Sequence, residues 1–213
     1  MTTTVDEPTR IARLPRTPDA RNFPVPFFVS WIDNKPDFRV ADGRALVRCV
    51  LERLCWICGG RLTRHAAFVV GPMCTVNRIS AEPPSHIDCA EYAATHCPFL
   101  ITPRMVRREK KLPEAYELPA GEMLMRNPGA SALWVTAHWL LIDDGSGKYL
   151  FQMGDPTEVR WYAEGRTALR AEVEESIRTG LPLLEERCST AAERAFLAEQ
   201  VELASQYLPP SDD

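Results

Sequence analysis

CWICGG occupies residues 55–60, and SHIDCAEY occupies residues 85–92. Each stretch holds two candidate metal ligands separated by two residues, and the four are Cys55, Cys58, His86 and Cys89. Zinc in structural sites takes four thiolate or imidazole ligands in a tetrahedron. The glycines that follow Cys58 permit the tight backbone turn of a zinc knuckle. The sequence therefore predicts that one Zn²⁺ ion joins these two stretches, and the rest of the predicted fold is arranged around it.

The second ligand pair is expected at the start of a helix. Ser85 is a good N-cap, and Pro98 ends the helical pattern that follows it. Side chains three residues apart lie on one face of a helix, so His86 and Cys89 would converge in its first turn. The positive end of the helix dipole also favours a thiolate at that position.

The chain between the two pairs predicts a hairpin. AAFVV at residues 66–70 and MCTV at residues 73–76 flank Gly71-Pro72, a pattern typical of two short strands folded back on each other. The order of knuckle, hairpin and ligand-bearing helix resembles the treble-clef zinc finger superfamily over residues 55–97. That resemblance implies that the four named residues are the ligands, although the second pair in the superfamily is more often two cysteines. Treble clefs occur in nucleases, ribosomal proteins and adaptor modules, so the resemblance does not identify an activity.

Other ligand sets stay open at this point. Cys74 or Cys97 could replace one of the four residues. If His86 points elsewhere, the three cysteines and a water molecule would form an open hydrolytic site, but the H-x-E and P-C-x2-C signature of zinc deaminases is absent. The cysteines could also be small buried apolar residues that bind no metal.

A nuclease is the alternative that gives the histidines a catalytic role. His65, Asn77 and His86 partly resemble the HNH nuclease motif, in which a histidine activates water, an asparagine orients it and a last histidine binds a divalent metal. Arg64 stands where an acidic ligand is usual, and His86 cannot serve both a structural zinc ion and a catalytic ion. We therefore favour a protein that is not an enzyme.

Length and composition bound the organisation of the chain. With 213 residues and 45% hydrophobic content, the chain can bury a substantial core. Residues 1–22 lack apolar periodicity and are predicted to be a disordered tail. Residues 23–208 are predicted to form a single globular body, and residues 209–213 a second tail. Seven cysteines without an export signal favour metal ligation in a reducing cytoplasm. No stretch approaches the length of a membrane span, so we expect a soluble, cytoplasmic protein.

The remaining patterns predict an α+β fold. Asp42 caps a helix at residues 43–54, and a strand precedes it at residues 24–31. Further strands are predicted at residues 122–126, 131–142, 148–153 and 158–163. Two helices follow, one at residues 167–179 that Gly180 closes, and one from Thr190 with a capping box to Glu193. The predicted architecture is a treble-clef zinc-binding N-terminal half that packs with a small antiparallel sheet and two C-terminal helices. The sheet and these two helices lie within residues 112–208.

Charge divides unevenly between the two halves. Residues 1–111 carry 17 Lys and Arg against 11 Asp and Glu, whereas residues 112–213 carry 8 against 18. The basic half includes RMVRREKK, whose candidate phosphate contacts are Arg104, Arg107, Arg108, Lys110 and Lys111. The sequence thus predicts a structural-zinc protein that acts as a nucleic-acid-binding or regulatory interaction module with DNA or RNA as partner.

A host protein is the alternative partner. GPMCTVNRISAEPPSH, residues 71–86, and CAEYAATHCPFL, residues 89–100, resemble segments of bacterial and phage proteins of unassigned function. This resemblance implies a bacterial or phage origin and no activity. A phage or bacterial factor that engages a host protein would need neither nucleic-acid binding nor catalysis.

Overall fold

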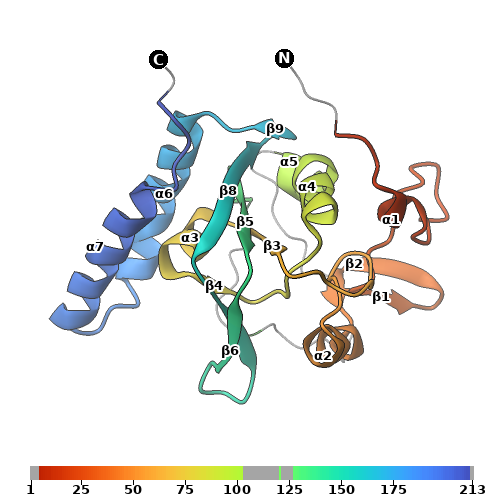
Figure 1. The fold of residues 1–213 in the computed structure, drawn as a ribbon, viewed down its shortest axis with the longest axis horizontal. Coiled ribbons are helices and arrows are strands. Elements are labelled where there is room, and N and C mark those ends of the chain that lie inside the picture. Colours follow the sequence, from red (N-terminus) through yellow and green to blue (C-terminus); the bar gives the residue numbers. More distant parts are fainter. Residues whose placement is uncertain (1–4, 103–119, 121–126, 212–213) are drawn as a thin grey trace.

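The centre of the protein is an antiparallel sheet of four strands (Figure 1). The structure is a computed structural model that describes residues 5–102, 120 and 127–211. The strands lie in the order β3 (Ala66–Val70), β5 (Ser131–Thr136), β8 (Pro156–Ala163) and β9 (Arg166–Thr167). All six residues of β5 are buried, because helices cover both faces of the sheet at this strand.

Helix α4 (Ile87–His96) covers one face of this sheet. Ala90 and Ala94 of the helix pack on Ala67, Leu133 and Tyr162 of the strands. Small alanine side chains let the helix approach the sheet closely. This contact fixes where α4 begins, and therefore where His86 and Cys89 lie.

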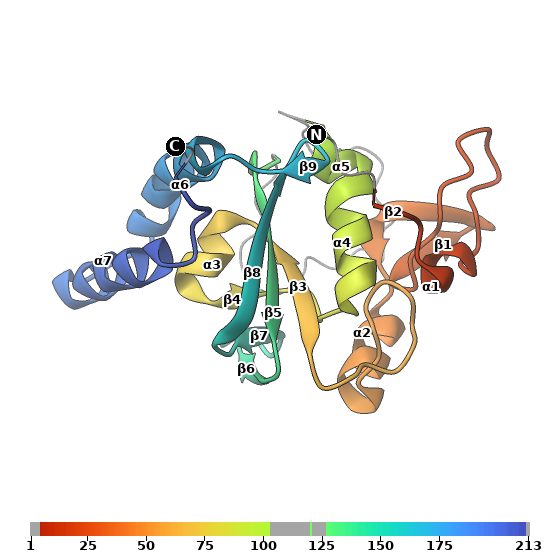
Figure 2. The same cartoon turned by 45° about the horizontal axis from the view of Figure 1, so that its top comes forward.

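Helices α3 (Pro72–Asn77), α6 (Arg170–Glu185) and α7 (Ala191–Ser205) lie on the opposite face (Figures 1 and 2). The alternate strand residues Phe68 and Trp134 point to this side and form the largest core cluster with Val173 of α6. The Nε1–H group of Trp134 donates to the carbonyl oxygen of Gly154 at 2.9 Å, so its polar atom is satisfied within the core.

A second, three-stranded sheet has the order β4 (Ile79–Ser80), β7 (Tyr149–Met153) and β6 (Trp139–Asp143). The single strand predicted at residues 131–142 is therefore wrong, since it divides into β5 and β6 of different sheets. The break follows from Thr136, whose Oγ1 lies 3.1 Å from the carbonyl oxygen of His138 and 2.9 Å from that of Asp155. These bonds turn the chain out of the first sheet.

The N-terminal part surrounds the two predicted ligand pairs. It contains α1 (Thr9–Ala12), β1 (Val29–Ile32), β2 (Lys35–Ala41), α2 (Gly43–Glu52) and, after α4, α5 (Pro98–Ile101). Asp42 caps α2 as predicted, because its carboxylate accepts the backbone N–H of Arg44 at 2.8 Å. Helix α2 ends before Arg53, which has a left-handed conformation, and the chain reaches Cys55 two residues later.

Residues 5–22 lie within the segment 1–22 for which the sequence predicts a disordered tail, and some of them contact the cysteine cluster. Ile11 is 1% exposed and packs against Cys55 and Cys89. Arg16 pairs with Glu7 at 2.7 Å, which holds the two ends of this segment together. The ordering entropy is offset because the segment covers the cysteine cluster, a long-range contact that local sequence patterns do not reveal.

The hairpin predicted between the ligand pairs is also wrong in its second half. Residues 73–76 belong to helix α3, and β3 pairs with β5 instead. Pro72 at the first turn of α3 suits a helix start, and Thr75 Oγ1 donates to the Pro72 carbonyl oxygen at 2.7 Å. The β-branched residues of MCTV are thus accommodated in a short helix because tertiary packing overrides their strand preference.

For the two C-terminal helices, one predicted boundary is confirmed and another is wrong. Thr190 and Glu193 form the predicted capping box of α7. Helix α6 does not close at Gly180 but continues to Glu185. Gly180 is buried against α3, where an added Cβ would lie 3.0 Å from Met73 Cγ, so packing explains the glycine.

Two predicted segments lie outside the described residues. They are the strand at residues 122–126 and the basic run at residues 104–111. Within the part of the chain that the structure describes, no helix has the length and apolar character needed to cross a membrane.

Replacing Leu133 by alanine tests the role of β5. Leu133 is fully buried, so the substitution removes apolar contacts and leaves a cavity, and we expect a loss of about 2–5 kcal/mol in the free energy of unfolding. Leu140→Ala is the matched control, because Leu140 is 66% exposed and its truncation is expected to change stability by less than about 0.5 kcal/mol. Urea unfolding of both variants makes the measurement, and equal losses would contradict the central place of β5.

Candidate metal centre

Cys55 and Cys58 lie in a tight turn directly after α2. The Gly59 N–H donates to the Cys55 carbonyl oxygen at 2.9 Å, and the Cys55 N–H donates to that of Gly60 at 2.7 Å. Gly59 has a φ of +70°, and a Cβ at this position would lie 2.8 Å from the ring of Phe27. Only glycine meets both demands without strain, so the turn needs a glycine at position 59.

The second ligand pair is held in place by the residues immediately before it. Ser85 and Ala67 exchange two backbone hydrogen bonds of 2.8 Å, which attach the start of α4 to β3. The Trp56 N–H also donates to the Pro84 carbonyl oxygen at 3.2 Å, which attaches the same segment to the knuckle. Residues 84–86 thus lie between the knuckle and the central sheet.

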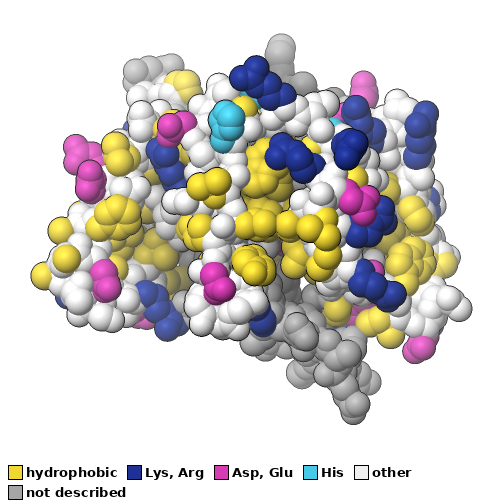
Figure 3. Space-filling model, turned by 60° about the horizontal axis from the view of Figure 1, so that its bottom comes forward, with side chains coloured by type: hydrophobic (Ala, Val, Ile, Leu, Met, Phe, Trp, Pro, Cys, Tyr) yellow, Lys and Arg dark blue, Asp and Glu magenta, His cyan; other side chains and the backbone are white. Residues whose placement is uncertain are grey.

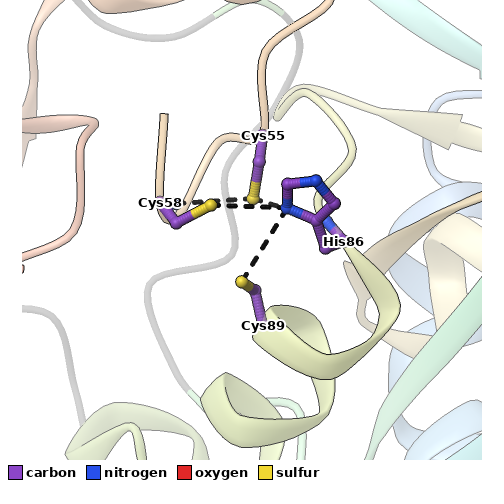
Figure 4. A group of neighbouring side chains, drawn as sticks. All are labelled: Cys55, Cys58, His86 and Cys89. Carbon is purple, nitrogen blue, oxygen red and sulfur yellow. Dashed lines mark hydrogen bonds between the residues drawn. The ribbon is translucent and has the colours of Figure 1, made fainter. Parts of the chain in front are cut away.

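Ser85 is not the N-cap that the sequence predicts. Its backbone groups are used by the bridge to Ala67, and His86 takes the N-cap position without a side-chain capping bond. The helix begins one residue later than expected. The spacing of three between His86 and Cys89 still brings both side chains to the same side, toward the knuckle (Figure 4).

The four side chains converge on a common centre. Their nearest ligand atoms all lie within 4.8 Å of one another. The Nδ1 atom of His86 is 3.3 Å from the Cys58 sulfur and 4.0 Å from the Cys89 sulfur. The edges of a zinc tetrahedron built from sulfur and nitrogen ligands measure about 3.5–3.8 Å. Cys55, Cys58, His86 and Cys89 can therefore hold a metal ion.

The imidazole of His86 is oriented by its second nitrogen. Nε2 lies 2.9 Å from the Arg61 carbonyl oxygen, to which it donates a proton when Nδ1 is left as the ligand atom. Metal-binding histidines usually carry such a partner, which fixes the tautomer and the ring. The sequence gives no signal for this contact, because a backbone carbonyl can come from any residue.

The charges of the cluster are strongly coupled. Hydrogen bonds to Cys55 and Cys58 raise the pKa of His86 to about 10, and hydrogen bonds to the same two sulfurs raise the pKa of Cys89. Burial would raise the pKa of Cys55, but hydrogen bonds from Cys58, Cys89 and His86 lower it. Three sulfurs this close cannot all be thiolates unless a cation balances them. A divalent metal ion supplies that charge, so the donor set fits one.

Three of the four ligand residues of the cluster are buried, and Cys58 is partly exposed. Cys55 and Cys89 are 0% exposed, and Ile11 and Leu14 of the N-terminal segment pack over them. Arg10 pairs with Asp88 at 2.7 Å and closes the edge beside α4. The covering residues were not predicted, although the spacing of three between Ile11 and Leu14 is the apolar pattern of a short helical turn.

The open hydrolytic alternative is not favoured by this geometry. His86 points its Nδ1 atom into the cluster and occupies the place that a reactive water would need (Figure 4). Neither Cys74 nor Cys97 belongs to the cluster of possible ligands found among the described residues. Cys74 packs instead on the opposite side of the sheet, and burial raises its pKa to about 11. Its place across the sheet separates the Cys74 sulfur from the cluster of possible ligand atoms.

The structure separates the residues of the predicted nuclease motif. Asn77 ends α3 on the face of the sheet that α6 and α7 cover, and its side chain accepts the Ile79 N–H at 2.9 Å. His86 lies at the start of α4 on the opposite face. An HNH centre needs these side chains around one ion, so the described fold offers no support for it.

Comparison of the chain with models of known protein families, with curated proteins and with solved structures finds no match in any of the three.

Gly59→Ala tests the geometry of the knuckle. The substitution places a Cβ against Phe27 in a left-handed residue, and we expect weaker metal binding and a loss of more than about 2 kcal/mol in stability. Gly145→Ala is the control, since Gly145 has a φ of +83° but no atom within 4 Å of an added Cβ. It should lose only about 1–2 kcal/mol from the left-handed conformation. Urea unfolding and competition with a chromophoric chelator measure both effects, and identical behaviour of the variants would count against the Phe27 contact.

Proposed function

We propose that Cys55, Cys58, His86 and Cys89 bind one structural Zn²⁺ ion and that the protein is a zinc-stabilised binding module. The observation that carries this proposal is the convergence of three sulfurs and His86 Nδ1, with Nε2 of the same ring on the Arg61 carbonyl oxygen. Thiolate with imidazole is the ligand chemistry of zinc. Enclosure of the cluster and a complete set of four protein ligands favour a structural ion over a catalytic one.

The proposed ion would connect segments that are distant in sequence. The knuckle, the start of α4 and the covering helix α1 meet at this cluster. The cluster of Cys55, Cys89, Ile11 and Ile57 is separate from the core of the central sheet. Zinc binding in small metal domains contributes about 10–16 kcal/mol, enough to decide whether such a part of the chain folds.

Elemental analysis of the purified chain tests the metal. We expect one zinc ion per chain, released by a strong chelator together with loss of structure around residues 5–62, because the ligands are joined through the ion. Cys89→Ser should lose the zinc, whereas Cys188→Ser, which changes a thiol between α6 and α7, should keep it. A protein that contains no zinc after growth in zinc-supplemented medium, or a Cys89→Ser variant with a full complement, would refute the site.

We further propose nucleic acid as the partner of the basic N-terminal half. Arg61 and Arg64 follow the knuckle and form no salt bridge within the described ranges, whereas most other arginines there are paired with carboxylates. Lys and Arg side chains gather on the half of the face in Figure 3 that carries the N-terminal elements. The sequence also predicts phosphate contacts at residues 104–111, which lie outside the described residues. Unpaired arginines are available to phosphates without first breaking an ion pair.

Binding of labelled DNA and RNA tests this partner. We expect affinity that falls steeply between two salt concentrations, because phosphate contacts release counterions. Arg107→Ala/Arg108→Ala should weaken binding to all sequences and lower the salt slope by about 1–2. Arg178→Ala/Arg194→Ala is the matched control, since it removes the same charge from α6 and α7 and should leave affinity unchanged. Fluorescence polarisation makes the measurement.

Two other outcomes would replace the nucleic-acid proposal. Cleavage that depends on added magnesium and is abolished by His65→Ala while zinc is retained would establish the nuclease alternative. If the protein shows no affinity for DNA or RNA even at low salt, the nucleic-acid proposal is wrong. The alternative is then a protein partner, such as a host protein.

A further inference from the structure

The α6–α7 hairpin has an open apolar cleft at its far end, on the side of the molecule away from the cysteine cluster (Figure 1). The cleft has a volume of about 410 Å³. Its lining includes Asn77, Leu184, Cys188, Phe196, Leu197 and Gln200. This volume lies in the range of sites that receive apolar groups of a ligand or partner.

Helix α7 carries two apolar stripes, and only one of them is used. Leu197, Val201 and Ala204 pack against α3 and α6. Phe196 and Leu203, seven residues apart on a second stripe, are 62% and 42% exposed. Figure 3 shows apolar side chains at the surface on this side of the molecule. An exposed phenylalanine beside a preformed cleft is typical of a contact surface, because a single helix rarely leaves so much apolar area in water.

The segment that carries the cleft is acidic overall. The charged residues of the lining itself are Arg187 and Glu193. Glu185, Glu186, Glu199 and Glu202 are exposed, lie close in sequence to lining residues, and form no salt bridge among the described residues. Arg170 and Arg178 of α6 are already paired with Glu174 and Glu175 at 2.8 and 2.6 Å. Residues 185–206 hold five Glu and two Arg, so the surface that a partner meets is negative. Its charge excludes nucleic acid and favours a cationic partner.

We propose that this cleft and the Phe196–Leu203 stripe bind an amphipathic helix of a partner protein, with apolar side chains on one face and Lys or Arg beside them. A helix is the occupant that matches the shape, because the stripe extends along α7 beyond the cleft and presents anchors spaced at i and i+7. The basic residues of the partner would face Glu199 and Glu202. A second copy of this chain docked by the same stripe would bring these glutamates against each other, which opposes self-association.

The binding surface does not depend on the metal. It is built from α3, α6 and α7, which share a core cluster distinct from the cysteine cluster. It is also distinct from the basic surface proposed for nucleic acid. The protein would therefore have two separate contact surfaces of opposite charge.

The test uses the full chain and a fluorescein-labelled designed helical peptide of about 18 residues, with leucine on one face and lysine on the other. We expect the peptide to bind, and Phe196→Ala to weaken binding at least about tenfold, because a central aromatic anchor is lost. Phe38→Ala is the matched control, since Phe38 is a 45% exposed phenylalanine on β2, far from the hairpin. It should not change the affinity. Both residues are exposed, so both variants should fold.

Two further measurements locate the contact. The peptide should slow alkylation of Cys188, which lines the cleft, and leave alkylation of Cys97 unchanged. A peptide with glutamate in place of lysine should not bind. Equal effects of Phe196→Ala and Phe38→Ala, or equal binding of both peptides, would overturn the proposal. Sedimentation showing a dimer that Phe196→Ala dissolves would assign the surface to a second copy instead.

Discussion

The convergence of three cysteine sulfurs and one imidazole nitrogen within 4.8 Å is the constraint on which the N-terminal half depends. Thiols in an apolar enclosure keep their protons, whereas adjacent thiolates repel one another, so such a cluster is costly without a balancing cation. The surrounding structure nevertheless holds the four side chains in this arrangement. Two backbone hydrogen bonds to β3 place the start of α4, the glycines of the knuckle place Cys55 and Cys58, and a carbonyl oxygen orients His86. This degree of preorganisation is what a structural ion requires of its ligands.

The central sheet separates the molecule into two sides with different properties. Alternation along β3 and β5 sends Ala67 and Leu133 toward α4 and the cysteine cluster, and Phe68 and Trp134 toward α3 and α6. The side with α4 carries the basic knuckle loop, and the side with α7 carries the acidic hairpin and its apolar cleft.

Elements with strong local signals were predictable. The caps of α2 and α7 lie where Asp42 and Thr190 indicate, because a capping side chain acts on backbone groups only two or three residues away. The α+β class follows from alternating patterns that are long enough to be unambiguous. Elements whose conformation depends on distant partners were predicted wrongly. MCTV is a helix because it packs under α6 and α7, and Gly180 lies within a helix because Met73 approaches it.

The sequence by itself determined the ligand types and their pairing, since two short spacings with cysteine and histidine specify the chemistry whatever the rest of the chain does. Only the tertiary structure decided that the two pairs meet, that Cys74 and Cys97 are excluded, and that residues 5–22 cover the cluster. It also decided that Asn77 and His86 lie on opposite faces of a sheet although nine positions separate them in the chain. The physical reason is that spacing sets geometry within a turn or a helix, whereas the meeting of separate segments is set by which apolar faces the whole chain can bury together.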